Sequence, residues 1–252
     1  MSILKKSSFF ALIILYSLIN HVAYAQVSKP VYVIVHGAWG GSWAFKKTDS
    51  LLTAKGCKVY RPCLTGLGER SHLASPMIGL TTHVADVVNT ILFEDLRNVI
   101  LVGHSYGGMV ISGVADRIPD RIQKVIYVDA FVPSDGESVK MIQAAKWDYY
   151  EKMLRGDLLF PPWIVPGKIP GDVPQPIKTF TDPIYLKSEK AKSIPGVYIL
   201  TVEKGKKAAE DDFAAQAERA KEKKWTMLQL ESDHNPQWSA TTKLVELLYQ
   251  NR

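Results

Sequence analysis

The sequence predicts an α/β fold, with a mostly parallel sheet flanked by helices. Short apolar segments alternate along the chain with amphipathic ones, which is the pattern of a parallel sheet covered on both faces. Three of the apolar segments are uninterrupted, as expected for strands that are buried on both sides. The 252 residues are 46% hydrophobic and 22% charged, which suits a single globular domain of this kind.

Each predicted element is bounded by a change in this pattern. The strands are expected at Val31–Val35, Cys57–Arg61, Val99–Val102, Val125–Val128, Gly196–Thr201 and Met227–Leu230. The helices are expected near Trp43–Lys55, Thr81–Leu92, Tyr106–Arg117, Asp212–Lys223 and Thr241–Gln250.

One interval, residues 134–190, breaks the alternation. It holds seven prolines together with aromatic residues such as Trp147 and Trp163. A long insertion after a core strand is usually functional or disordered, and the aromatic content argues against disorder. We therefore expect a cap insertion that roofs an apolar pocket. The alternative is a loop packed on the surface without any contact to a substrate.

The first 25 residues have the pattern of a secretory signal peptide. Lys5 and Lys6 precede a short apolar run at 9–16, and Ala23-Tyr24-Ala25 supplies the small residues of a cleavage site. The run is shorter than the roughly 20 residues that span a bilayer. We therefore expect a secreted or periplasmic protein with no stable membrane span after cleavage, and an α/β domain over residues 26–252.

Net charge gives no sign of a nucleic-acid partner. Removal of residues 1–25 takes away Lys5 and Lys6 and no acidic residue, so the net charge falls from +6 to +4. The remaining basic residues are scattered, and the run at 221–224 is typical of a solvated helix face.

The two cysteines are expected to be free thiols. Cys57 and Cys63 are six residues apart, and six extended residues span roughly 20 Å. A disulfide needs Cα atoms within about 7 Å of each other. Only a sharp reversal of the chain at Pro62 would allow the two to pair.

A candidate nucleophile follows the third predicted strand. The strand runs into Gly103-His104-Ser105-Tyr106-Gly107-Gly108, and a helix follows directly. A nucleophile elbow requires this order of strand, sharp turn and helix, with glycines where neighbouring backbones pass closely. The turn lifts the Ser105 hydroxyl above the sheet and points the helix N-terminus at a developing oxyanion. The alternative is a glycine-rich turn with a helix-capping serine.

A second glycine-rich turn, residues 36–41, follows the first strand. Such a loop places one backbone N–H beside the nucleophile, and we expect this donor to be Ala38. With the N–H of Tyr106 it forms a two-donor oxyanion hole. The spacing of the glycines does not match the G-x-G-x-x-G pattern of dinucleotide binding.

The candidate base is His234. In chains with this elbow the base follows the serine and the acid, and His234 is the one histidine downstream of Ser105. It lies between the last predicted strand and the last helix. The alternative is a loop histidine without a catalytic role. No spacing of histidines and carboxylates suggests a metal site, and no cofactor is expected.

The acid has several candidates. Asp129 ends an apolar strand, where an unpaired carboxylate would be costly. Glu203 follows the next strand but lies beside lysines, in what resembles an exposed loop. Acids just before a helix, as at 210–212, are commonly caps or partners of the helix dipole. We favour Asp129 over Glu203 and over the cluster of Glu210, Asp211 and Asp212.

From residue 30 onward the chain resembles the α/β-hydrolase superfamily, in particular bacterial esterases related to plant hydroxynitrile lyases and methyl-ester esterases. The likeness rests on the segments Leu64-Thr65-Gly66-Leu67-Gly68-Glu69-Arg70, Gly103–Gly108 and Tyr127-Val128-Asp129-Ala130-Phe131-Val132-Pro133. The resemblance implies an α/β-hydrolase fold, with Ser105 as nucleophile, His234 as base, and Ala38 and Tyr106 as oxyanion donors. The plant relatives carry their acid after the strand that matches 196–201, where this chain has no aspartate. Haloalkane dehalogenases of the same superfamily can carry theirs at the position of Asp129.

The resemblance also bears on the reaction. The lyases have a threonine where Gly37 stands, and a lysine after the catalytic histidine where this chain has Asn235. Departing cyanide needs a cation, which Asn235 cannot supply. We therefore expect a carboxylesterase-type serine hydrolase that acts on small to medium apolar esters. A C–C lyase is one alternative, and a slow-turnover binding protein on a hydrolase scaffold is another.

Overall fold

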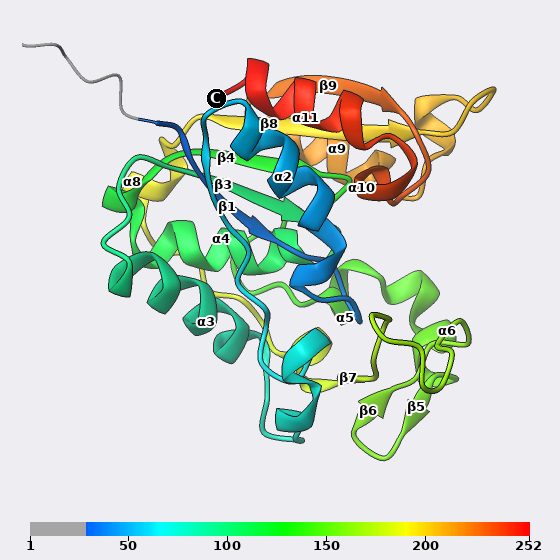
Figure 1. The fold of residues 1–252 in the computed structure, drawn as a ribbon. Helices are drawn as coiled ribbons and strands as arrows, with labels where there is room; N and C mark the ends of the chain where they lie inside the picture. The colour runs from blue at the N-terminus through cyan, green and yellow to red at the C-terminus, as the bar shows by residue number, and fades with distance from the viewer. Residues whose placement is uncertain (1–28) are drawn as a thin grey trace, which may run out of the picture.

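The computed structural model describes residues 29–252, and the predicted signal peptide at 1–25 lies outside this part (Figure 1). A six-stranded sheet forms the centre, and all of its neighbouring strands are parallel. The predicted α/β fold is therefore confirmed. In spatial order the strands are β2 (Lys58–Tyr60), β1 (Val31–Val35), β3 (Val99–His104), β4 (Ile122–Val128), β8 (Gly196–Val202) and β9 (Thr226–Glu231).

Helices cover both faces of this sheet, as Figure 1 shows. Alternate side chains of each strand enter different cores, because successive residues of a strand point to opposite faces. In β1, Tyr32 and Ile34 belong to one core, and Val33 and Val35 to the other. The first core is closed by α2 (Lys46–Ala54) and α11 (Thr241–Gln250). The second is closed by α3 (Leu80–Phe93), α4 (Gly107–Arg117) and α9 (Ala214–Glu222).

The observed ends of the elements have local causes. The strand predicted at 57–61 is reduced to β2, which stops just before Arg61 and Pro62. The helix predicted from Asp212 begins at Ala214, because the Asp211 carboxylate accepts the N–H of Phe213 and holds the preceding turn. The segment predicted from Trp43 begins as a 3-10 turn, η1 (Ser42–Phe45), before α2.

The insertion at residues 134–190 is folded from short pieces. Its small antiparallel sheet has the order β5-β6-β7, and Figure 1 shows it apart from the main sheet. Its elements, with α8 at its end, are α5 (Val139–Ile142), η4 (Ala144–Lys146), α6 (Trp147–Glu151), β5 (Leu154–Arg155), β6 (Leu158–Leu159), β7 (Gln175–Pro176), α7 (Lys178–Thr181) and α8 (Glu189–Lys192). The remaining short helices are η2 (Gly68–Leu73), η3 (Pro119–Arg121), η5 (Ala208–Glu210) and α10 (Pro236–Ser239).

Both cysteines are buried free thiols, as predicted. The Cys63 thiol donates to the carbonyl of Leu67 at 3.2 Å. Across residues 29–252, no helix has the length and apolar character needed to cross a membrane.

Candidate active site

Ser105 lies in a sharp turn between β3 and α4. Its backbone is left-handed, with φ of 53°, which is uncommon for a residue other than glycine. The flanking glycines leave room for this turn. A Cβ on Gly103 would lie 2.8 Å from the Gly107 carbonyl oxygen, and one on Gly108 would lie 2.2 Å from that of Phe131. The predicted order of strand, turn and helix is therefore present, with close backbone packing at the glycines.

The structure brings Ser105, His234 and Asp129 into one chain of hydrogen bonds. The Nε2 atom of His234 lies 3.0 Å from Ser105 Oγ, and its Nδ1 lies 2.6 Å from Asp129 Oδ2. With Nδ1–H donating to the carboxylate, Nε2 is left to accept the serine proton. The three side chains follow β3, β4 and β9, so they meet because parallel strands end at the same edge of the sheet.

Asp129 is the one predicted acid that contacts His234. It is buried, and its Oδ1 accepts the backbone N–H of Thr201 at 3.1 Å. Glu203 instead pairs with Lys206 on the surface. The later acids bond elsewhere: Glu210 accepts the N–H of Lys207, Asp211 that of Phe213, and Asp212 pairs with Lys146.

The imidazole of His234 contacts two other rings. It stacks on Phe213 with centroids 4.8 Å apart and planes 9° apart, and His104 lies on it at 4.9 Å. The Nε2–H of His104 donates to the His234 carbonyl at 2.7 Å. Burial, together with the neighbouring His234, lowers the pKa of His104 to about 3. His104 therefore stays neutral and fixes the position of His234 without adding charge.

The two predicted oxyanion donors lie in the turns that follow the neighbouring strands β1 and β3. Ala38 comes three residues after the end of β1, and Tyr106 comes directly after Ser105. Because β1 and β3 are parallel and pair as far as Val35 with Gly103, the two turns lie at the same edge of the sheet. Within the described part of the chain, the backbone N–H groups of Ala38 and Tyr106 donate no hydrogen bond. Neither amide is therefore engaged by another group of residues 29–252.

The loop that carries Ala38 is held by residues for which no sequence pattern indicates a role. Trp39 has a left-handed φ of 59°, and its N–H donates to the buried Gln175 Oε1 at 2.8 Å. Its carbonyl accepts the N–H of Val173 at 2.8 Å. The amide of Gln175 is oriented in turn by Thr179 Oγ1 at 2.8 Å. The insertion thus fixes both backbone groups of the residue beside Ala38.

The side chain of Tyr106 is held by a buried network that includes His83. His83 donates from Nε2 to the Thr65 carbonyl at 2.9 Å, so its Nδ1 accepts the hydroxyl of Tyr106 at 3.0 Å. Thr65 is itself bonded to Asp86 through both its N–H and its hydroxyl. Arg70 donates to the same carboxylate at 3.2 Å. The segment at 64–70 therefore supports one of the two candidate oxyanion donors.

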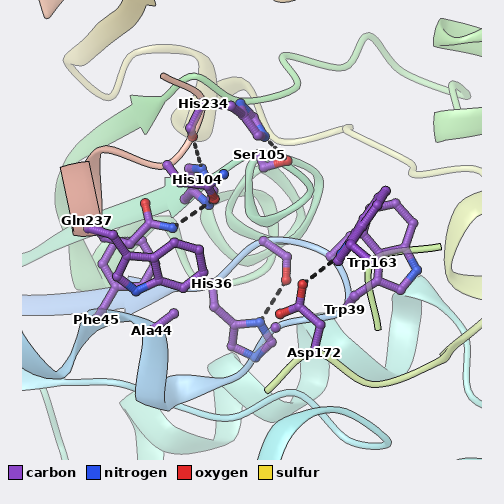
Figure 2. A pocket seen from close by; sticks show the side chains of 15 residues that line it. His36, Trp39, Ala44, Phe45, His104, Ser105, Trp163, Asp172, His234 and Gln237 are labelled. Atoms are coloured by element: carbon purple, nitrogen blue, oxygen red, sulfur yellow. Dashed lines mark hydrogen bonds between the residues drawn. The ribbon is translucent and has the colours of Figure 1, made fainter. Parts of the chain in front are cut away.

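A cavity of about 390 Å³ opens beside these groups (Figure 2). That volume fits a small ligand. It lies over Ser105 and His234, and the insertion contributes Trp163 and Asp172 to its lining. Within residues 29–252, no cluster of three or more histidine, cysteine or acidic side chains is arranged to bind a metal ion.

Three buried histidines predict a loss of stability in acid. Burial lowers the pKa of His36 and His83 to about 4, and that of His104 to about 3. An unfolded histidine titrates near 6.5, so the unfolded chain takes up these protons first. The free energy of unfolding is therefore not reduced by these histidines above about pH 6.5, and it decreases as the pH falls toward 4. We expect a loss of roughly 1 kcal/mol per histidine and pH unit.

Urea unfolding at pH 7, 6 and 5 measures the slope of the free energy of unfolding against pH. His104→Gln keeps a donor for the His234 carbonyl and removes one titrating group, so the slope should fall by about a third. The exposed His72 provides the matched control, and His72→Gln should leave the slope unchanged. An equal slope in all three proteins would contradict the assignment.

Curated relatives are esterases. The chain is 51% identical over 108 residues to a carbendazim hydrolyzing esterase of Nocardioides sp. (strain SG-4G), which is 43% of this chain and 45% of that protein. It is 28% identical over 127 residues to methylesterase 8 of Arabidopsis thaliana, which is 46% of this chain and 43% of the relative. The chain thus spans less than half the length of these relatives.

Solved structures match over most of the chain. An extracellular alpha/beta-hydrolase from a Paenibacillus species has a TM-score of 0.74 at 22% identity, over 88% of this chain and 98% of that one. A methylesterase from Arabidopsis has a TM-score of 0.64 at 25% identity, with the same coverage. The alpha/beta hydrolase family matches residues 32–247. This chain therefore belongs to the alpha/beta hydrolase family.

Proposed function

We propose that the protein is a serine hydrolase that cleaves carboxylic esters through an acyl-enzyme on Ser105. The observation that carries the proposal is the hydrogen-bonded chain of Ser105, His234 and Asp129 beside a cavity that Ser105, His234 and Ala38 line. The esterase names of the curated relatives support an ester bond as the target. No cofactor is needed for this chemistry.

The mechanism has two steps. His234 Nε2 takes the proton of Ser105 as the Oγ atom attacks the ester carbonyl, and Asp129 stabilises the imidazolium that forms. The oxyanion is bound by the N–H groups of Ala38 and Tyr106. The imidazolium then protonates the departing alcohol. Water, activated by His234, attacks the acyl-enzyme and releases the acid.

Hydrolysis is favoured over C–C lysis by the residues around the cavity. No lysine or arginine is present among the described residues that line it, so departing cyanide would meet no fixed cation. Asn235 stands after His234, and its side-chain oxygen accepts a bond from Gln237 at 3.0 Å. A side chain at Gly37 would begin 2.9 Å from His104 Nδ1 and 3.1 Å from Ser105 Cβ.

The insertion at 134–190 serves as a cap in this proposal. Trp163 lines the cavity and packs edge-on against Trp39, with centroids 5.2 Å apart. Trp39 belongs to the turn at residues 36–41, which carries Ala38 and is called the oxyanion loop in this proposal. Such aromatic walls favour small to medium acyl or alkyl groups with apolar surface. The substrate is thus a small-molecule ester that is enclosed between the sheet and the cap.

Turnover of p-nitrophenyl esters tests the proposed function. Residues 26–252 should hydrolyse short-chain esters with multiple turnovers and react at Ser105 with a fluorophosphonate. Ser105→Ala should lose at least about a thousandfold in kcat. A burst of one equivalent that then stalls would indicate the slow-turnover binding protein instead. If neither hydrolysis nor labelling is seen, the proposal is wrong.

The acid is tested by a matched pair of substitutions. Asp129→Asn keeps the size of the side chain but favours the wrong tautomer of His234, so kcat should fall by roughly 10⁴-fold. Glu203→Gln changes an exposed side chain that pairs with Lys206, and kcat should stay within about twofold. Steady-state kinetics on one ester measures both. The reverse ranking would move the acid to the end of β8.

Gln175 is proposed as a positioning residue for the oxyanion loop. Gln175→Met keeps the volume but removes the acceptor of the Trp39 N–H. The neighbouring Ala38 amide is then less well fixed, so kcat should fall about tenfold or more while KM changes little. Gln175→Glu, protonated in this buried position, restores the acceptor and should recover most of kcat. Equal kcat in all three proteins would contradict this role.

We also propose that export removes residues 1–25. The basic, apolar and small-residue regions described above support this step, and the structural relative from Paenibacillus is named as extracellular. Mass spectrometry of protein collected outside the cytoplasm should find an N-terminus at Gln26. Intact residues 1–25 on that protein would argue against cleavage.

A further inference from the structure

Asp172 is the one acidic side chain among the described residues that line the cavity over Ser105. It belongs to the loop between β6 and β7 and thus to the insertion. Figure 2 shows its carboxylate among the lining side chains, bonded to Trp163. Its Oδ1 lies 3.9 Å from the point where a Cβ on Gly40 would stand, which places it against the oxyanion loop.

The carboxylate is incompletely paired. Trp163 donates its Nε1–H to Oδ2 at 2.9 Å, and Oδ1 accepts no hydrogen bond from any residue at 29–252. An ionised carboxylate has about four acceptor sites, so most of its capacity is unused. Lys168 attracts the carboxylate, and no salt bridge joins the two within residues 29–252. Burial raises the pKa of Asp172 because the charge lacks full compensation.

Aromatic side chains line the same cavity as this acceptor. Trp39 and Trp163 meet at right angles with centroids 5.2 Å apart, and Trp238 stacks on Trp43 at 5.6 Å. Trp39, Trp163 and Trp238 all line the cavity. Indole faces bind planar rings and also attract cations. A carboxylate that shares a cavity with such rings and with the nucleophile is suited to a substrate that combines apolar surface with an N–H donor.

On the basis of the hydrolase function proposed above, we propose that Asp172 is a specificity-determining residue that accepts a hydrogen bond from an N–H group of the substrate. The enzyme then prefers esters whose acyl or alcohol part carries an amine or another N–H donor over their hydrocarbon isosteres. The donor satisfies Oδ1, and the indole rings contact the apolar remainder. This refines the expectation of an apolar substrate, because one polar group is recognised within an aromatic site.

Matched esters test the proposal. The first pair is methyl 4-(aminomethyl)benzoate and methyl 4-ethylbenzoate, which place an ammonium or a methyl group on the acyl side. The second pair, 4-(aminomethyl)benzyl acetate and 4-ethylbenzyl acetate, places them on the alcohol side. For a neutral donor, methyl indole-5-carboxylate is compared with methyl benzofuran-5-carboxylate. The quantity compared is the ratio of kcat/KM within each pair, corrected for the rate of alkaline hydrolysis.

The wild-type ratio should favour the N–H ester by about tenfold in at least one pair, since hydrogen bonds to charged groups are among the stronger ones. Asp172→Asn keeps an oxygen that accepts from Trp163 but removes the charge, so the ratio should fall toward one. Asp148 is an exposed acid of the same insertion, and Asp148→Asn should keep the wild-type ratio. A ratio near one in all three wild-type pairs, or a ratio that Asp172→Asn does not change, would overturn the proposal.

A binding measurement separates this inference from the function on which it rests. In Ser105→Ala, quenching of tryptophan fluorescence reports binding of the same esters without turnover. The inference is supported, even if no ester is hydrolysed, when Ser105→Ala binds the aminomethyl ester more tightly than its ethyl isostere. The double variant with Asp172→Asn should then bind the two esters equally. Equal binding of the two esters, with or without the Asp172 carboxylate, would overturn it even if hydrolysis is fast.

Discussion

The hydrogen bond between Asp129 and His234 is the contact on which the candidate site depends, because it joins the middle of the sheet to its last strand. Strand β8 lies between β4 and β9 and provides the connection. The N–H of Asp129 donates to the Ile199 carbonyl at 2.8 Å, and its Oδ1 accepts from Thr201. The backbone of β8 thus fixes the carboxylate and leaves Oδ2 for the imidazole. A buried carboxylate without such donors would be strongly unfavourable.

The same sheet offsets backbone strain at two residues of the site. Ser105 and Asp129 both have left-handed backbones, with φ of 53° and 45°, and each costs on the order of 1 kcal/mol or more. They follow His104 and Val128, which are partners in the ladder of β3 and β4. The N–H of Ser105 donates to the Val128 carbonyl at 3.2 Å. Neighbouring strands therefore end together, and the register of the ladder sets the separation of the serine and the acid.

Much of this arrangement follows from periodicity along the chain, and the remainder does not. The apolar runs locate all six strands, and the strand order of the fold places Ser105 and His234 at one edge. The residue pattern ranks Asp129 above Glu203 on burial, because both follow strands that reach this edge, and the resemblance to haloalkane dehalogenases adds support. In the structure Asp129 bonds to His234, whereas Glu203 pairs with Lys206. Gln175 lies 136 residues from Trp39 in an insertion whose strands have only two residues, so no pattern indicates their contact.

The histidines that line the cavity beside His234 are neutral, so the proposed reaction forms its imidazolium in a site without another histidine cation. His36 and His104 line the cavity, yet burial holds both neutral, and each donates from one ring nitrogen to a backbone carbonyl. An imidazolium that forms on His234 then meets the Asp129 carboxylate without repulsion from a second cation. The burial that costs stability in acid thus serves the electrostatics of the site. Asp172 adds a negative charge at the cap side of the same cavity. In the function that we propose, the two ends therefore differ in what they attract: the serine end binds the carbonyl, and the cap end binds an N–H donor.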